Sequence, residues 1–310
     1  MGSGGLKTPT FGELMDVYPA LAEAQRGRTG GSPCERRVET VLLSLDLVLR
    51  RLGWPRTRLW TDLDARTLDG LFESMKASGL SALSAKSYLE ACRGVAARWT
   101  ILRWAELGFE VKPLDMPSVF VPPKRYRELA AATKRGILDL YAELKPSDPE
   151  AWFFATMMLK FGMRNSDVRA LAWDAFREEQ DGVYLTYVPH KTRLTSGRVV
   201  HWPVDDGTWA DILEYRKSHP LMPFVRGGDR KARNRASAAQ ARLRKALRGA
   251  GLSGGKSAYE LRKMCASAVY RNFGQEMVSS LLGDDISTIL KHYADPSSVG
   301  RRVDVTTLMR

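Results

Sequence analysis

The chain has 310 residues, of which 44% are hydrophobic and 27% charged, a composition typical of a folded globular protein. No apolar run approaches the roughly 18 residues of a membrane-spanning helix, so we expect no membrane partner. The cysteines Cys34, Cys92 and Cys265 are too few and too widely spaced for a disulfide framework or a paired zinc site. These features favour a reducing, cytoplasmic location and a protein without a bound metal or cofactor.

Positive charge is concentrated in one part of the chain. The formal net charge is +13, and between residues 226 and 271 there are 13 Lys or Arg against Asp229 and Glu260, a net charge of +11 over this segment alone. A general excess of arginine can reflect a GC-rich genome. Clustering of this kind instead favours a polyanionic partner such as nucleic acid.

The first third of the chain has the pattern of a helical domain. Residues 1–10 (MGSGGLKTPT) are assigned no secondary structure, and residues 1–32 are expected to form a flexible N-terminus or short arm. In ERRVETVLLSLDLVLRRLG (35–53) the apolar residues recur every three or four positions, which predicts an amphipathic helix. The segment 109–125 holds four prolines, which predicts an extended linker with a domain boundary near residue 120. Further helices are predicted over 67–79 and 84–108.

The remainder is predicted to be helical with a single β-hairpin. Helices are expected at 126–145 and 148–162, the second capped by Asp148. Two β-branched and aromatic runs within 182–204, separated by a polar turn, predict the hairpin. Further helices are predicted over 208–219, 236–249, 259–272, 276–283 and 287–294. The expected fold is therefore mainly α with a small β-hairpin or sheet.

Four segments in fixed order carry the chemistry: GMRNSDVRALAWDAF (162–176), VPHKTRLTSGRVVHWPV (188–204), YELRKMCASAVY (259–270) and LLGDDISTILKHY (281–293). In this order and spacing the chain resembles the tyrosine recombinase, or phage integrase, family. That family has an arginine after a helix-ending glycine, a lysine in a β-hairpin, a His-x-x-Arg on a helix, and a Leu-Gly-His followed nine residues later by a tyrosine.

The resemblance implies a division of the chain. Residues 33–112 resemble the helical core-binding, DNA-contacting domain of the family, 113–123 would be the linker, and 124–310 would be the catalytic domain with a C-terminal tail. It also implies double-stranded DNA as partner, a homo-tetramer on two paired sites, a nucleoid-associated location when bound, and accessory DNA-bending proteins as possible partners.

The matching residues suit phosphoryl transfer. A phosphodiester under attack gains negative charge on its non-bridging oxygens, and the guanidinium forks of Arg164 and Arg262 can stabilise that charge. Asp167, three residues after Arg164, is expected to orient it. Lys191 in the hairpin is the expected general acid that protonates the departing 5′ oxygen, with Arg193 as its nearest competitor. Each of these residues alone would more commonly serve a structural or solvated role.

Two positions depart from the family pattern. Tyr259 stands where histidine is usual, and a phenol can still donate a hydrogen bond to a phosphate oxygen. Asp284 stands where histidine or tryptophan is usual, and a free carboxylate there would repel the transition state. We rank pairing of Asp284 with an arginine or lysine ahead of a role as base for the nucleophile.

Tyr293, nine residues after Asp284, is the expected nucleophile. Attack by its phenolate would give a 3′-phosphotyrosyl link and a free 5′ hydroxyl, so rejoining needs neither ATP nor metal. The remaining basic residues suit contact with the DNA backbone, although an amphipathic core helix with a solvated face is the alternative for the segment 233–248. The expected DNA contacts are Arg193, Arg198, Arg233, Arg235, Arg242, Arg244, Lys245 and Arg248.

The leading hypothesis is a site-specific recombinase of a mobile element that performs integration, excision or resolution. The departures at positions 259 and 284 support a second hypothesis, a DNA-binding accessory protein that kept the fold and lost catalysis. A third keeps cleavage but in a topoisomerase or telomere resolvase.

Overall fold

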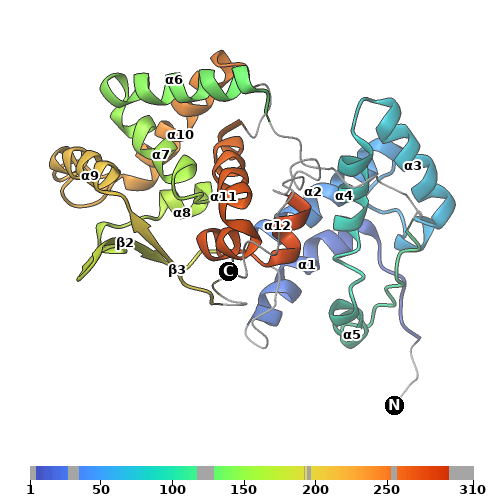
Figure 1. Cartoon of the computed structure of the whole chain (residues 1–310). Helices are drawn as coiled ribbons and strands as arrows, with labels where there is room; N and C mark the ends of the chain where they lie inside the picture. The colour runs from blue at the N-terminus through green and yellow to red at the C-terminus, as the bar shows by residue number, and fades with distance from the viewer. Residues whose placement is uncertain are drawn as a thin grey trace, which may run out of the picture. The chain divides into compact units, whose positions relative to one another are not determined.

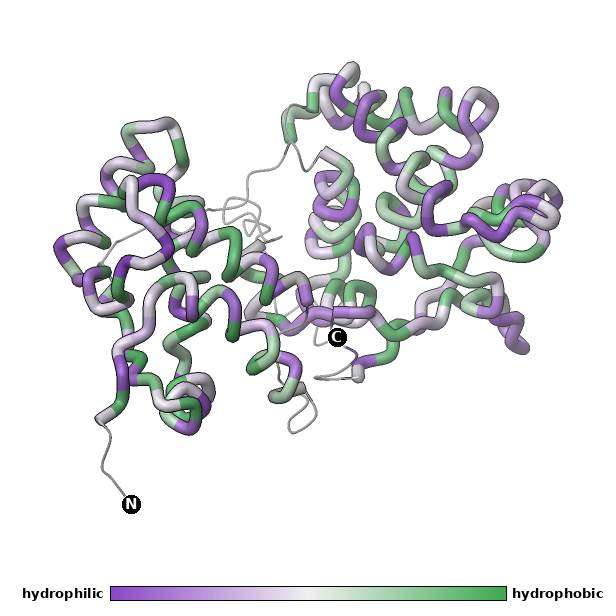
Figure 2. The backbone as a smooth tube through the Cα atoms, turned by 180° about the vertical axis from the view of Figure 1, so that it is seen from behind, coloured by the Kyte–Doolittle hydropathy of each residue, from purple (hydrophilic) through white to green (hydrophobic). Residues whose placement is uncertain are grey.

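The computed structural model describes residues 5–26, 35–116, 129–191, 193, 197–252 and 257–292. It divides into two compact units, Met1–Pro123 and Lys124–Arg310 (Figure 1). Hydrophobic and hydrophilic residues alternate along the helices of both units (Figure 2). Within the described residues, no helix is both long and apolar enough to cross a membrane.

The first unit is helical and has its own hydrophobic core. Its elements are α1 (Phe11–Arg26), α2 (Glu35–Leu52), the 3-10 helix η1 (Trp60–Asp62), α3 (Ala65–Ala77), α4 (Ala82–Cys92) and α5 (Arg98–Glu106). Trp60 and Trp104 are fully buried in this core, and their indole N–H groups donate to the carbonyls of Lys112 and Val95 at 2.9 and 2.7 Å.

The expectation of a flexible N-terminus is wrong for residues 11–26, which form α1. Phe11, Leu14 and Tyr18 lie on one face of this helix and are buried in the core of the first unit. Thr10 and Glu13 form a capping box: the Thr10 N–H donates to Glu13 Oε2 at 2.8 Å, and the Glu13 N–H donates to Thr10 Oγ1 at 3.2 Å. Both signals are present in the sequence, in TFGE and in the apolar spacing that follows it.

The single helix predicted over 84–108 is also wrong, because the chain turns between α4 and α5. Gly94 lies in this turn, and a Cβ there would come within 2.7 Å of Val41 Cγ2 and 3.1 Å of the Tyr18 hydroxyl. The N–H groups of Gly94 and Val95 bond three residues back, to Ala91 and Cys92. Close packing against α1 and α2 therefore replaces the helix that periodicity favours.

The second unit combines helices with a small sheet. Its helices are α6 (Ala131–Ser147), α7 (Pro149–Leu159), α8 (Asn165–Arg169), the 3-10 helix η2 (Trp173–Ala175), α9 (Asp206–Ser218), α10 (Ala232–Gly249), α11 (Ser257–Leu282) and α12 (Ile286–His292). Its strands are β1 (Phe176–Glu179), β2 (Gly182–Tyr187) and β3 (Val200–Val204). The backbone of α11 kinks at Gly274 (φ 83°), which separates the two helices predicted for this segment.

The described strands form one antiparallel sheet in the order β1-β2-β3, with β2 paired to both neighbours. The predicted hairpin is β2–β3. Strand β1 was not predicted, because its sequence Phe-Arg-Glu-Glu buries only its first residue. Gln180 and Asp181 form the two-residue turn into β2, whose first residue Gly182 pairs with Glu179.

Helix α7 is the centre of the second unit. It packs against α6, α10 and α11, and every residue from Glu150 to Met158 is buried. The predicted cap is present: Asp148 Oδ1 accepts the N–H of Ala151 at 3.1 Å, and Pro149 occupies the first turn. The burial of α7 fixes the position of the residues that follow it, where the candidate site begins.

Candidate active site

The site begins at the sharp turn between α7 and α8. Gly162 has a φ of 59°, in the left-handed region that favours glycine, and a Cβ there would lie 2.4 Å from a methyl carbon of Leu282 in α11. This close approach brings the turn against the end of α11. Arg164 lies two residues later, just before α8, and its side chain is only 13% exposed.

Arg262 reaches the same point from α11, with a side chain that is fully buried. Its Nη1 donates to the carbonyl oxygen of Gly162, and its Nη2 donates to Asp284 Oδ2 at 2.6 Å. Arg164 Nη2 donates to the other oxygen of the same carboxylate, Asp284 Oδ1, from a position 120 residues away in sequence. One carboxylate thus bridges the two arginines that the sequence predicts to converge.

Asp284 is therefore found in the pairing arrangement that we ranked first. Its side chain is 8% exposed, and its backbone oxygen accepts a hydrogen bond from Ser279 Oγ at 2.7 Å. The fork geometry of guanidinium groups suits carboxylate and phosphate oxygens alike. The donors that would hold a phosphodiester are thus directed at a carboxylate of the same chain.

Asp167 is only loosely paired with Arg164, since its Oδ2 lies 3.9 Å from Arg164 Nη1. Its stronger contact is with the hairpin: Asp167 Oδ1 accepts the backbone N–H of His190 at 3.0 Å. The acidic residue thus joins α8 to the segment that carries Lys191. This contact is not predictable from the Arg-x-x-Asp spacing.

Lys191 and Arg193 lie between β2 and β3, and both are exposed. Arg198, further along the same connection, binds inward: its Nη1 donates to Ser279 Oγ at 2.6 Å and to the carbonyl oxygen of Asp284 at 3.3 Å. The base of the hairpin also packs on the loop after α11, because a Cβ on Gly283 would meet Pro189 Cγ at 2.9 Å.

Sequence reasoning missed Tyr187 at the end of β2, a partly exposed residue whose hydroxyl oxygen is buried. Its hydroxyl has no hydrogen-bond partner among the described residues. Burial raises its pKa, and the Asp167 carboxylate raises it further, while the nearby guanidiniums of Arg262 and Arg164 act in the opposite direction. The only signal in the sequence is its position four residues before Lys191.

Two further predicted site residues are Tyr259 and Tyr293. Tyr259 is half-buried, and its ring centre lies 5.9 Å from Lys263 Nζ. Tyr293 lies outside the described residues. Within the part of the chain that is described, no group of three or more His, Cys, Asp or Glu side chains could hold a metal ion.

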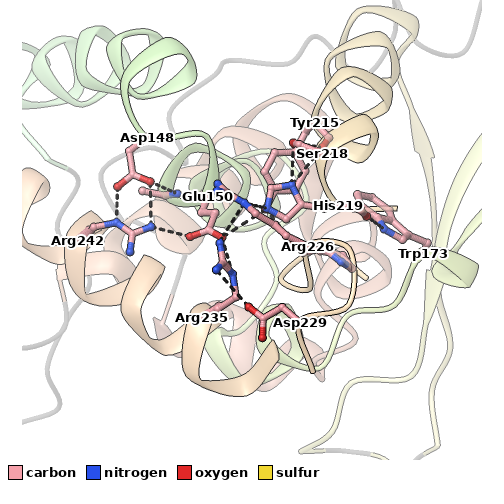
Figure 3. Close-up of polar contacts among 12 residues, drawn as sticks. Asp148, Glu150, Trp173, Tyr215, Ser218, His219, Arg226, Asp229, Arg235 and Arg242 are labelled. Carbon is pink, nitrogen blue, oxygen red and sulfur yellow. Dashed lines mark hydrogen bonds and ion pairs between the residues drawn. The ribbon is translucent and has the colours of Figure 1, made fainter. Parts of the chain in front are cut away.

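The basic helix α10 is partly occupied by contacts within the protein (Figure 3). Arg235 donates to Glu150 and Asp229, and Arg242 donates to Asp148 and Glu150. Burial opposes ionisation of Glu150, but hydrogen bonds from His219, Arg235 and Arg242 outweigh it and lower the pKa of Glu150 to about 2.

These two arginines therefore anchor α10 to the start of α7, the alternative role that we considered for this helix. Among the other predicted DNA contacts in α10, Arg244 is half-buried, with an Nε that has no hydrogen-bond partner among the described residues. Arg233, Lys245 and Arg248 are exposed. For these residues DNA contact remains a prediction.

No protein-family model matches the sequence, and no curated protein matches it significantly. Solved structures do match. A lambda integrase dimer bound to a COC′ core site has a TM-score of 0.62 and 18% identity over 96% of this chain and 98% of that one.

Two further structures are similar to this chain. The Tn1549 transposon integrase in complex with transposon right-end DNA has a TM-score of 0.58 and 13% identity, covering 97% of this chain and 100% of that one. The XerH site-specific recombinase bound to its palindromic difH substrate has a TM-score of 0.57 and 14% identity, covering 84% of this chain and 77% of that one. The predicted fold class is confirmed: over most of its length the chain has the fold of the tyrosine recombinases.

Proposed function

We propose that the protein is a DNA strand transferase of the tyrosine recombinase type. The observation that carries this proposal is the convergence of Arg164 and Arg262 on one pair of carboxylate oxygens, in a chain with this fold. Two buried guanidinium groups held around a single oxyanion are suited to a phosphate oxygen pair, and their charge is fixed at any working pH.

In the proposed reaction, the phenolic oxygen of Tyr293 attacks the phosphorus of a phosphodiester and the bond from phosphorus to the 5′ oxygen breaks. The phenolic proton passes to water, and Lys191 donates a proton to the departing 5′ oxygen. The products are a 3′-phosphotyrosyl link and a free 5′ hydroxyl. Arg164 and Arg262 stabilise the charge that develops on the non-bridging oxygens, and reversal of the same steps rejoins the strand.

Asp284 gives the proposed reaction a requirement of its own. Its carboxylate holds both guanidiniums, so a phosphodiester must replace the carboxylate on at least one of them. DNA binding at this position is therefore weakened, because part of its free energy is used to break these ion pairs. We expect neutral substitution of Asp284 to increase affinity for phosphate groups at the site.

Double-stranded DNA is the proposed partner, and a homo-tetramer on two paired sites is the proposed assembly. The matching structures support both, since they include a lambda integrase tetramer bound to a Holliday junction, with a TM-score of 0.61 and 14% identity. The exposed residues Arg193, Arg233, Lys245 and Arg248 are the proposed contacts to the DNA backbone.

A second candidate function is a DNA-binding accessory protein without catalysis, and the bridging carboxylate favours it because it neutralises the arginine pair. One experiment separates the two. DNA that co-purifies with the protein is sequenced to find the bound site, and that site is synthesised with a nick beside the cleavage point. The enzyme must form a covalent adduct on the nicked site, and the Tyr293→Phe variant must not. Specific binding by the wild type without any adduct would establish the accessory function.

A further inference from the structure

The hairpin that carries Lys191 is held to the rest of the second unit on both of its limbs. On the incoming limb, Asp167 accepts the N–H of His190, the residue directly before Lys191. On the outgoing limb, Arg198 donates to Ser279 Oγ and to the carbonyl oxygen of Asp284. Lys191 is exposed and lies one residue after His190 and seven residues before Arg198.

The Arg198 contact ends at the residue that bridges the arginine pair. Asp284 presents its side chain to Arg164 and Arg262 and its backbone carbonyl to Arg198. A displacement of the outgoing limb is thereby transmitted to the loop that holds both guanidiniums. Asp284 is therefore common to the hairpin and to the oxyanion-binding pair.

We propose that Arg198 is a positioning residue, whose guanidinium fixes the Lys191 hairpin relative to the arginine pair so that the lysine can protonate the departing oxygen. The inference rests on the proposed function and replaces the expectation that Arg198 contacts DNA. Arg198 and Arg193 on the same connection are both exposed, but the hydrogen bonds of Arg198 direct its guanidinium toward the end of α11.

Loss of the Arg198 side chain should leave the fold intact. The loop after α11 retains the bond from Ser279 Oγ to the carbonyl oxygen of Asp284, at 2.7 Å, when Arg198 is truncated. The packing of Gly283 against Pro189 and Val200 also remains. Truncation therefore releases only the outgoing limb of the hairpin.

The test uses a substrate that does not need a general acid. In a 5′-bridging phosphorothiolate the leaving group is a thiolate, whose conjugate acid has a pKa of about 8.5 rather than that of an alcohol, so it departs without protonation. Single-turnover cleavage by the full-length protein is measured at saturating DNA, on oxygen and sulfur versions of the recovered site. The variants are Lys191→Ala and Arg198→Ala. Arg193→Ala is the control, because it also removes one arginine from the connection between β2 and β3.

On the oxygen substrate, Lys191→Ala should be slower by about 10²- to 10⁴-fold, the usual contribution of a general acid, and Arg198→Ala by about 10- to 100-fold. On the sulfur substrate both defects should shrink to within about threefold of the wild type. Arg193→Ala should keep the oxygen-to-sulfur rate ratio of the wild type.

An Arg198→Ala defect of equal size on both substrates would overturn the inference, since the residue would then act on phosphate charge rather than on the lysine. Weaker DNA affinity with a normal rate at saturation would also overturn it, because that is the result for a DNA backbone contact. If the wild type forms no adduct even on the sulfur substrate, the proposed function itself fails, and the inference with it.

Discussion

Removal of the Asp284 carboxylate should destabilise the protein and at the same time expose an anion site. Asp284→Ala leaves two guanidiniums, of which Arg262 is fully buried and Arg164 is 13% exposed, without their shared counter-ion. Breaking a buried ion pair by removal of one partner costs about 3 to 5 kcal/mol. Arg262 keeps its hydrogen bond to the Gly162 carbonyl, so we expect a loss at the lower end of this range, about 3 kcal/mol.

Urea denaturation measures this loss as a lower midpoint with an unchanged slope. Sulfate then reports on the exposed site. An anion that binds only the folded variant stabilises it by about 1.4 kcal/mol at ten times its dissociation constant. Sulfate also stabilises proteins in general by exclusion from their surfaces, so the informative quantity is the extra stabilisation of Asp284→Ala over the wild type at equal sulfate concentration.

Asp285→Ala is the matched control, because it removes the same charge from the neighbouring, exposed residue. Its effect on stability should stay within about 1 kcal/mol, the cost of a lost helix cap at most, and it should show no extra response to sulfate. The reasoning is refuted if the two variants lose equal stability, or if sulfate stabilises Asp284→Ala no more than the wild type.

Three other outcomes are expected. Gly162→Ala should lower the free energy of unfolding by about 2 to 4 kcal/mol, because the new residue must adopt a φ of 59° and its Cβ clashes with α11. Gly136→Ala lies within α6 with no atom near the new Cβ, and it should raise the free energy of unfolding by about 0.5 to 1 kcal/mol. Chemical denaturation of both variants measures these changes. Because the pKa of Glu150 is lowered from 4.5 to about 2, its ionised form contributes stability above pH 4.5 that is lost as the pH falls toward 2. Between about pH 6 and pH 2.5 the denaturation midpoint of Glu150→Gln should therefore fall less than that of the wild type. Arg248→Ala should weaken DNA binding and reduce the slope of log affinity against log salt concentration by about one. Arg242→Ala should lower stability and leave that slope unchanged, because its guanidinium is bound by carboxylates. Equal slopes for the two variants would contradict this assignment.

Local signals in the sequence predicted most of the elements. The apolar spacing of residues 35–53 predicted α2, Asp148 predicted the start of α7, and two β-branched runs predicted β2–β3. The missed helix α1 had a capping box at Thr10 and Glu13, so its signals were available. Strand β1 had little signal, because its charged residues acquire strand geometry only by pairing with β2.

The side-chain partners were decided by the tertiary structure. The sequence singled out Arg164, Arg262 and Asp284 as residues of one site, because their spacing resembles a known pattern. It could not determine that the carboxylate bridges both arginines across 120 residues, or that Arg198 binds the same residue from the hairpin. Hydrophobic period, caps and turns act between neighbours in the chain, whereas an ion pair depends on distance in space, which exists only after α7 and α11 have packed.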